Sequence, residues 1–343
     1  MAAPSRREKL ALSLAISVAA HLITGGAGFV GVNLAERLRQ RGDQVLLVDN
    51  LSRGRRANLG ALAADAGVRF AVADCADRDA LLLAVASAGL EGRIETVWHL
   101  AANSDIAAGG ADLRVDVRDT FLTTTGVLET MRALGLKSLN FASSSAVYGD
   151  LDGRAVTEGD GPLEPISNYG AMKLASEAQI RAACETFLDR ANVFRFPNVV
   201  GVPATHGVIL DFVRKLSADP RRLPVLGDGA QKKPYLHVRD LVEAMLFLEA
   251  RLGDGFNVVN IGPDDEGITV REIAEMTAAA VSPRARIEYG TTRGGWPGDV
   301  PCFRYDVDKA RRLGWRWGSS SQAAVRQAVA EIVEQEEGAL CRP

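Results

Sequence analysis

Short hydrophobic runs alternate along the chain with longer segments in which hydrophobic residues recur every three or four positions. The short runs predict buried strands, and the longer segments predict helices that turn one face toward a core. The first such pair is the run at 21–24, which is followed by three glycines and then by the helical spacing of Val32, Leu34, Ala35 and Leu38. The same alternation predicts strands at 45–49, 69–73, 96–100, 138–142 and 192–196, and helices at 79–88, 116–134 and 168–188. Strands that alternate with helices predict an α/β fold, with a parallel sheet covered on both faces.

The alternation breaks after Pro197, where prolines and glycines become frequent. The pattern then predicts helices at 209–216, 238–250, 270–280, 307–313 and 321–337, and one more strand at 257–261. We therefore expect an N-terminal extension (1–20), a sheet domain (21–196 and 236–262) and a smaller α/β lobe (197–235 and 263–343). The smaller lobe is expected to cover the crevice of the sheet domain, to hold a second ligand, and to bury Trp315 and Trp317 in its core.

The composition is that of an ordinary globular enzyme and excludes several classes of protein. The 343 residues are 47% hydrophobic and 24% charged, and 40 basic against 43 acidic residues leave a net charge of −3. No run of like charge indicates a nucleic-acid partner. The four cysteines are scattered without a C-x-x-C pair, which predicts reduced thiols and no metal site. The first twenty residues have the basic and apolar regions of a signal peptide, but the apolar run is too short to cross a membrane and continues directly into the first strand. We expect a cytoplasmic protein without membrane contact.

The glycine turn after the first strand predicts a dinucleotide site. Gly25, Gly28 and Gly31 have the spacing G-x-x-G-x-x-G, which lets the backbone approach a ligand closely. The helix that follows offers the N–H groups of its first turn, at Phe29 and Val30, to a pyrophosphate. Asp49 ends the second strand about 20 residues later, where a carboxylate accepts hydrogen bonds from an adenosine ribose. These features indicate a doubly wound sheet of the Rossmann type that binds NAD, because Asp49 would repel the 2′-phosphate of NADP.

A second group of residues indicates proton transfer. Tyr169 and Lys173 lie at i and i+4 of a predicted helix, so they share one face. A nearby ammonium group is expected to lower the pKa of the tyrosine and to make it a general base. The strand at 138–142 ends in three serines, at the edge of the sheet where a substrate would lie. A surface Tyr–Lys pair and serines that only stabilise a turn are the alternative interpretation.

In this order and spacing, the motifs TGGAGFVG, DNLSRG, HLAAN, SSSAVYG and Y-x-x-x-K resemble those of the extended short-chain dehydrogenase/reductase family. Within it, the chain most resembles nucleotide-sugar epimerases of the UDP-glucose 4-epimerase type, over about residues 22–317. The resemblance implies the Rossmann fold, NAD as cofactor and a homodimer built on the helices at 116–134 and 168–188.

The resemblance also implies a role for each matched residue. The three glycines would contact the pyrophosphate, Asp49 and Asn50 the adenosine ribose, and Asp74 and Cys75 the adenine. The nicotinamide side would be lined by Leu100, Ala101 and Ala102. Ser144 would bind the sugar O4 and Tyr169 would be the base beside Lys173, so these three are the expected catalytic residues. Tyr169 and Lys173 are also expected to contact the cofactor, with Lys173 bonding the hydroxyls of the nicotinamide ribose. Substrate contacts are implied for Asn198, Lys233, Tyr235, Arg293 and Phe303.

Two positions depart from the pattern of the related epimerases. Lys233 replaces an arginine that binds phosphate, and a lysine lacks the bidentate fork of arginine. Trp296 stands where relatives have another arginine, so Arg293 is the expected substitute. Phe303 matches a position that limits the size of the C2 substituent of the sugar, which predicts that an N-acetyl group is disfavoured.

Other reactions of the family remain as alternatives to 4-epimerisation of UDP-glucose or UDP-galactose. Sugar-nucleotide 4,6-dehydratases and UDP-glucuronate decarboxylases use acidic residues after the catalytic serine or threonine, where this chain has Ser145 and Ala146. Alanine cannot move a proton, which argues against both reactions. A catalytically silent NAD-binding protein is a third alternative, and the presence of all three catalytic residues argues against it.

Overall fold

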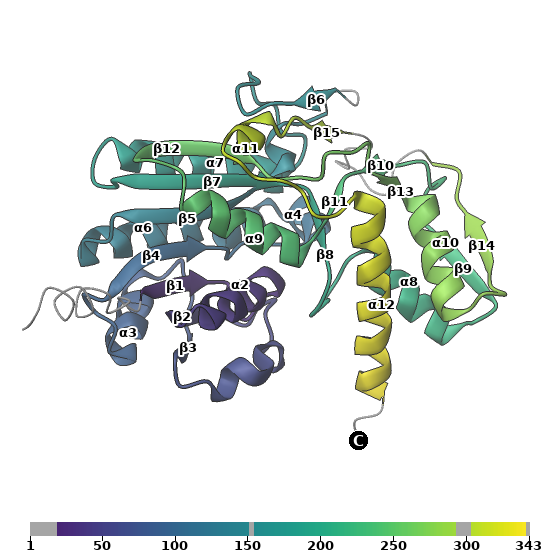
Figure 1. Cartoon of the computed structure of the whole chain (residues 1–343), viewed down its shortest axis with the longest axis horizontal. Helices are drawn as coiled ribbons and strands as arrows, with labels where there is room; N and C mark the ends of the chain where they lie inside the picture. The colour runs from purple at the N-terminus through teal and green to yellow at the C-terminus, as the bar shows by residue number, and fades with distance from the viewer. Residues whose placement is uncertain (1–18, 151–153, 293–302, 341–343) are drawn as a thin grey trace, which may run out of the picture.

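The central sheet has seven parallel strands in the order β12-β7-β5-β4-β1-β2-β3 (Figure 1). This computed structural model describes residues 19–150, 154–292 and 303–340 of the chain. The strands are β1 (Ala20–Thr24), β2 (Gln44–Asp49), β3 (Val68–Val72), β4 (Ile94–His99), β5 (Ser138–Ser144), β7 (Arg190–Phe196) and β12 (Gly255–Asn260). All six pairings between them are parallel, which confirms the predicted Rossmann-type α/β fold. The strand order reverses direction between β1 and β4, and that switch point is where such sheets bind ligands.

Helices cover both faces of the sheet and form a separate hydrophobic core on each. One core contains side chains of α2 (Phe29–Gln40) and α9 (Val238–Glu249). The other contains side chains of α3 (Arg78–Ala88), α6 (Thr123–Leu134) and α7 (Asn168–Cys184). Strands buried on both faces read as continuous hydrophobic runs, which is why the sequence predicts them well. The short helices η1 (Arg56–Ala64) and η3 (Ser145–Val147) lie in the connections.

The helix predicted at 116–134 is not one continuous α-helix. The chain forms α4 (Ile106–Ala111) and α5 (Leu113–Asp116), then the π-helical segment η2 (Val117–Leu122), and only then α6. No glycine or proline lies within residues 112–125, so the sequence pattern could not reveal the boundaries between α5, η2 and α6. Short π-helical segments are frequent at functional sites, and this one packs against α7.

A smaller lobe surrounds its own hydrophobic core beside the sheet. It contains α8 (Val208–Ala218), α10 (Val270–Val281) and α12 (Ser321–Leu340), with the strand pair β9 (Arg222–Val225) and β14 (Arg286–Tyr289). Figure 1 shows α12 between the sheet and the rest of this lobe. Four short strands complete the region: β8 (Asn198–Val200), β10 (Lys232–Lys233), β11 (Tyr235–His237) and β13 (Ile268–Thr269).

The segment before α12 departs from the prediction. Trp315 and Trp317, which we expected in the core of the smaller lobe, pack against the core of the sheet domain instead. The ring of Trp315 lies 5.2 Å from that of Phe247 in α9. Likewise, α11 (Asp308–Arg312) contacts β12 of the central sheet. Hydrophobicity predicted that these tryptophans are covered, but it could not say by which element. Nearby, β15 (Arg304–Tyr305) pairs with β6 (Ala155–Val156).

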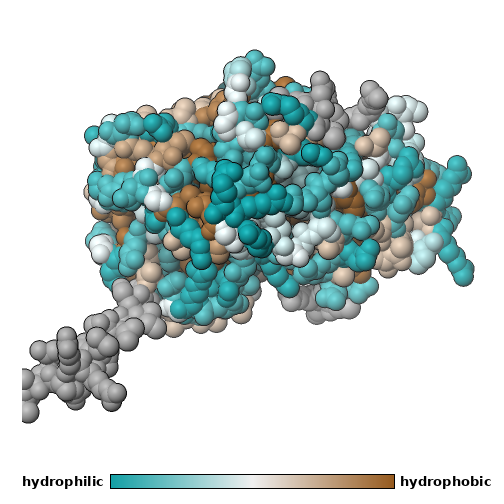
Figure 2. Space-filling view, turned by 45° about the horizontal axis from the view of Figure 1, so that its top comes forward, coloured by the Kyte–Doolittle hydropathy of each residue, from teal (hydrophilic) through white to brown (hydrophobic). Residues whose placement is uncertain are grey.

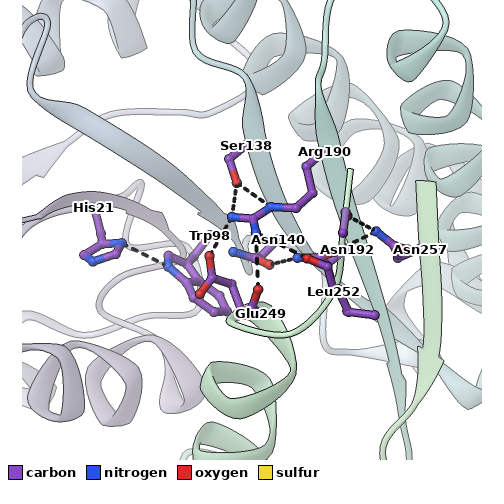
Figure 3. Close-up of polar contacts among 10 residues, drawn as sticks. His21, Trp98, Ser138, Asn140, Arg190, Asn192, Glu249, Leu252 and Asn257 are labelled. Carbon is purple, nitrogen blue, oxygen red and sulfur yellow. Dashed lines mark hydrogen bonds and ion pairs between the residues drawn. The ribbon is translucent and has the colours of Figure 1, made fainter. Parts of the chain in front are cut away.

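Polar side chains link the amino-terminal halves of the strands at one end of the sheet (Figure 3). Arg190 donates hydrogen bonds to Ser138 at 3.1 Å and to Glu249 at 2.8 Å. Asparagines on three neighbouring strands form a ladder, in which Asn257 donates to Asn192 at 3.2 Å and Asn192 donates to Asn140 at 2.9 Å. This end of the sheet is therefore fixed by side-chain hydrogen bonds between neighbouring strands and from β7 to α9.

Hydrophilic residues dominate the face of the molecule seen in Figure 2, with small hydrophobic areas between them. Among the helices of the described ranges, none has the length and apolar character needed to cross a bilayer.

Candidate active site

The turn between β1 and α2 is a close-packed backbone cradle at the carboxyl end of the sheet. Gly25 has φ +71°, and a Cβ there would lie 2.9 Å from the backbone nitrogen of Ala101. A Cβ at Gly31 would overlap the carbonyl oxygen of Gly25 and lie 2.9 Å from the Cα of Gly26. The N–H of Gly28 donates to the carbonyl of Gly25 at 3.0 Å. The first and third glycines are thus required by packing, and they bring the start of α2 directly to the strand ends.

The start of α2 fits the pyrophosphate of a dinucleotide. Its N-cap is Gly28, no side chain caps the helix, and its first turn contains no acidic residue. The N–H groups of Phe29, Val30 and Gly31 are therefore available to an anion, which the helix dipole also favours.

Asp49 lies at the end of β2 next to this turn and is almost completely buried. It accepts hydrogen bonds from the N–H groups of Ala27 at 3.0 Å and Leu51 at 2.8 Å. Burial raises the pKa of Asp49, and these two hydrogen bonds oppose that shift. The carboxylate therefore fixes the glycine turn, and each oxygen keeps a lone pair for a ribose hydroxyl. The neighbouring Asn50 accepts a hydrogen bond from the N–H of Ser52.

The other residues predicted to contact the cofactor follow β3 and β4. Asp74 accepts from the N–H of Ala76 at 2.9 Å, and Cys75 is buried beside it. Burial raises the pKa of the Cys75 thiol to about 12, so it is a packing residue rather than a nucleophile. Leu100 continues β4 by donating to the carbonyl of Thr24, and Ala101 lies against Gly25. Ala102 follows them in the same partly buried loop. All these positions surround the strand-order switch point.

The three predicted catalytic residues come from β5 and α7. Ser144 ends β5, and its Oγ accepts from the N–H of Ala146 at 3.1 Å. Tyr169 and Lys173 lie one turn apart on α7, which Ser167 caps. The Nζ of Lys173 donates to the carbonyl of Ala142 at 2.6 Å and lies 5.9 Å from the centre of the Tyr169 ring. The side chain of Lys173 is almost fully buried, so the sheet holds its charge close to the tyrosine.

The pKa values of this pair differ from our expectation. Burial raises the pKa of Tyr169 to about 12, the charge of Asp116 adds to the rise, and a hydrogen bond with Ser144 opposes it. Burial lowers the pKa of Lys173 itself to about 7, against the charges of Glu177 and Asp116. The phenol of Tyr169 is therefore protonated at neutral pH, because desolvation outweighs the hydrogen bond with Ser144.

A buried ion pair that sequence reasoning missed supports these residues. Glu177, one turn after Lys173, accepts from the Nε and Nη2 of Arg195 in β7 at 3.0 and 2.6 Å. Ser143 also donates to Glu177. The two charged side chains are only 4% and 5% exposed. Together these contacts join α7 to β5, which carries the serine motif, and to its neighbour β7. The only signal in the sequence is an acid at the same helical spacing as Tyr169 and Lys173.

A second buried network joins the ends of β1 and β4 to α6 and α7. His99, at the end of β4, contacts Thr24 of β1 at 2.7 Å and Thr124 of α6 at 3.1 Å. Thr124 in turn donates to Ser176 of α7 at 3.0 Å. Burial, with a contribution from the charge of Lys173, lowers the pKa of His99 to about 3, so this ring is neutral. His99 therefore ties β1 and α6 together behind the site.

The chain matches the family model described as "NAD dependent epimerase/dehydratase family" over residues 21–262. The chain belongs to this family. Its NAD dependence agrees with the glycine cradle, the uncapped start of α2 and the position of Asp49.

The sequence similarity to named relatives extends over most of this chain. It is 31% identical to a UDP-glucose 4-epimerase of Mycolicibacterium smegmatis over 91% of this chain and 97% of the relative. It is 30% identical to a UDP-glucose 4-epimerase of Corynebacterium glutamicum over 86% of this chain and 89% of the relative.

Among solved structures, a UDP-galactose 4-epimerase matches with a TM-score of 0.79 and 34% identity, covering 92% of this chain and 99% of that one. The UDP-glucose 4-epimerase of Thermus thermophilus in complex with NAD matches with a TM-score of 0.77 and 29% identity, covering 91% and 98%. The chain is thus an NAD-dependent enzyme of the extended short-chain dehydrogenase/reductase type, similar in sequence and fold to nucleotide-sugar epimerases.

Three of the residues predicted to bind the substrate lie in short strands that follow β7 in the chain. Asn198 in β8 and Tyr235 in β11 are register partners in one strand pair, and Lys233 in β10 pairs with Ile268. Asn198 is exposed, whereas Tyr235 is buried in the core of the smaller lobe.

Two further substrate predictions concern the segment that precedes β15. Phe303 packs in a small hydrophobic cluster, with its ring 5.6 Å from that of Tyr305. Arg293 and Trp296 lie outside the described residues.

Proposed function

We propose that this enzyme inverts C4 of a nucleotide sugar, most specifically of UDP-glucose or UDP-galactose. The observation that carries the proposal is that Ser144 at the end of β5 meets Tyr169 and Lys173 of α7, with no acidic side chain at position 145 or 146. The relatives named UDP-glucose 4-epimerase support this choice. NAD, when bound, supplies reversible hydride transfer at its nicotinamide.

We further propose that the sheet domain (21–196 and 236–262) binds the cofactor and that the smaller lobe (197–235 and 263–343) binds the sugar nucleotide. We also propose that the enzyme acts in the cytoplasm.

Each catalytic side chain has a distinct task in this proposal. Tyr169 removes the proton from the sugar O4 as C4 is oxidised, and it returns the proton when C4 is reduced. Lys173 stabilises the phenolate form of Tyr169 by its charge. Ser144 orients O4 by a hydrogen bond, from the end of β5. Asn198, Lys233 and Tyr235 hold the nucleotide part, and Arg293 takes the place of the arginine that relatives have at the position of Trp296. Phe303 disfavours an N-acetyl group at C2.

Ala146 separates epimerisation from elimination chemistry. A dehydratase needs groups that protonate and deprotonate the neighbouring carbons, and the methyl group of Ala146 cannot do so. A 4-keto sugar formed in this site can therefore only take the hydride back from the reduced cofactor. If the sugar turns over in the site, the hydride returns to the opposite face and inverts C4.

The proposal predicts that purified enzyme, incubated with UDP-glucose in deuterated water, forms UDP-galactose without deuterium on carbon. The hydride that returns comes from the C4 of the substrate, so solvent hydrogen never reaches a carbon atom. NMR of a panel that includes UDP-N-acetylglucosamine measures both the product and the sugar preference. Deuterium at C5 or C6, or a 4-keto-6-deoxy product, would identify a dehydratase, and NAD binding without turnover of any sugar would identify a silent protein.

We also propose that the enzyme is a homodimer. Three exposed hydrophobic side chains, Leu113, Val117 and Leu122, lie along α5 and η2, and Ile166 is exposed just before α7. Such an apolar surface is typical of an interface. Sedimentation velocity should show a dimer at micromolar concentration, and Leu122→Asp should shift it to monomer. Leu226→Asp, at an exposed leucine of the smaller lobe, should remain dimeric. A wild-type monomer would contradict the proposal.

A further inference from the structure

A carboxylate outside the predicted site lies buried between the nicotinamide side and the catalytic helix. Asp116, the last residue of α5, is 0% exposed. Its Oδ1 accepts from the side-chain amide of Asn103 at 2.8 Å, and its Oδ2 accepts from that of Asn168 at 3.1 Å. Asn103 belongs to the loop that follows β4, and Asn168 immediately precedes Tyr169 in the chain. Asp116 therefore connects the two segments between which the reacting groups would meet.

The residues around the Asp116 carboxylate leave room for it and fix the neighbouring loop. A Cβ at Gly109 in α4 would overlap the carboxyl group of Asp116, so α4 can pack there only with glycine at that position. The N–H of Asn103 donates to the hydroxyl of Thr120 in η2 at 3.1 Å, which fixes the loop from the other side. The carboxylate also lies at the N-terminus of α7, where the helix dipole favours a negative charge.

Asp116 has no cation of its own. Within the described ranges, no lysine, arginine or histidine lies within ion-pair distance of it, and both of its hydrogen-bond donors are neutral amides. Burying an unpaired carboxylate costs several kcal/mol. Its charge nevertheless acts on both members of the catalytic pair, since it raises the pKa of Lys173 and of Tyr169.

The other groups that face Lys173 leave few sources of negative charge. Glu177, on α7 itself, is already bonded to Arg195. From β4, His99 is neutral, and from β5 the ring of Phe141 lies 4.6 Å from Nζ. Asp116 comes from α5, which packs against α7, and it is thus a carboxylate beside the helix of Lys173 whose charge no arginine neutralises.

We propose that Asp116 is a positioning residue, which fixes the start of the catalytic helix to the loop after β4 and serves as the buried counter-charge of Lys173. This inference rests on the proposed function, because it assumes that Tyr169 and Lys173 exchange the proton of the reaction. It assigns Asp116 no contact with the substrate.

The inference predicts the pH dependence of Asp116→Asn. Activity requires one proton on the Tyr169–Lys173 pair, so kcat has an acid limb and an alkaline limb that belong to the pair. Because Asp116 raises both pKa values, its removal shifts both limbs to lower pH. We expect a shift of about one pH unit, and kcat about tenfold lower on the alkaline side of the optimum, with KM little changed. The measurement is kcat and KM against pH, with thermal unfolding as a check on the fold.

The matched control is Asp112→Asn. Asp112 lies four residues earlier, is solvent-exposed and is paired with Arg114. Its charge is screened by water and salt, so its loss should leave both limbs in place. A purely structural role of Asp116 would lower kcat equally at every pH, and limbs identical to those of the wild type would overturn the inference.

A second variant guards against misfolding of Asp116→Asn. Asn168→Ala removes one amide from a half-buried side chain and keeps the charge of Asp116. We expect kcat to fall about tenfold through misplacement of Tyr169, with both limbs unmoved. Wild-type kcat in this variant would overturn the positioning role. Failure of the proposed function is distinguished by the wild type, which would then form no C4-inverted product.

Discussion

Replacing Tyr169 with phenylalanine should lower kcat by about 10²–10⁴-fold, which is the usual contribution of a positioned general acid–base group. The ring remains, so the packing of α7 against β5 and η2 should persist and the variant should keep NAD and melt near the wild-type temperature. Measurements of kcat by product NMR and of bound cofactor by absorbance separate these effects.

Tyr148→Phe is the matched control for this prediction. Tyr148 lies in the same motif as Ser144, but its hydroxyl donates to Asn260 at 2.7 Å inside the protein. Its loss should cost about 1 kcal/mol of stability and change kcat only a few-fold. If Tyr169→Phe retained more than about a tenth of the wild-type kcat, Tyr169 would not be the base.

Replacing Gly31 with alanine should abolish NAD retention. The new methyl group would overlap the carbonyl of Gly25 and approach the Cα of Gly26, and both are backbone atoms that cannot move alone. The start of α2 must then shift away from the strand ends, at a cost of about 1–3 kcal/mol. The measurements are the bound NAD per chain after purification and the free energy of unfolding.

Gly110→Ala tests whether any glycine substitution has this effect. Gly110 lies in α4, has no positive φ, and a Cβ there meets no atom within 4 Å. Alanine favours the helix at such a position, so this variant should be at least as stable as the wild type and keep its cofactor. If Gly31→Ala also bound NAD normally, the cradle would not be the cofactor site.

The alternation of hydrophobic and helical patterns predicted the strands of the sheet within one or two residues. It worked because the central strands of a parallel sheet are buried on both faces, so most of their residues are hydrophobic. The interruption at η2 could not be predicted in this way, since its residues keep a helical hydrophobic spacing while the hydrogen bonding changes. Trp315 and Trp317 show the same limit of prediction from hydrophobicity. Their hydrophobic character predicts that they are buried, but it does not predict which element they pack against.

The candidate site shows a different limit. Motif spacing led to Ser144, Tyr169 and Lys173, because the serine ends a predicted strand and the other two residues lie one turn apart on a predicted helix. It gave the wrong direction for the pKa of Tyr169 in the free protein, because desolvation depends on the surrounding fold. Asp116 and the Glu177–Arg195 pair were missed for the same reason. A charged residue is usually exposed, and only the packed structure shows that these three are buried.

The position of β12 in the sheet affects how the protein is made. This strand pairs with β7 at the edge of the sheet, yet about sixty residues that include α8, β9 and α9 separate the two strands in the chain. During synthesis, residues up to 196 leave the ribosome well before their last strand exists, so β7 has an unpaired edge in that interval. Open strand edges can pair with other chains. Truncation before residue 255 should therefore yield an aggregation-prone fragment rather than a smaller cofactor-binding protein.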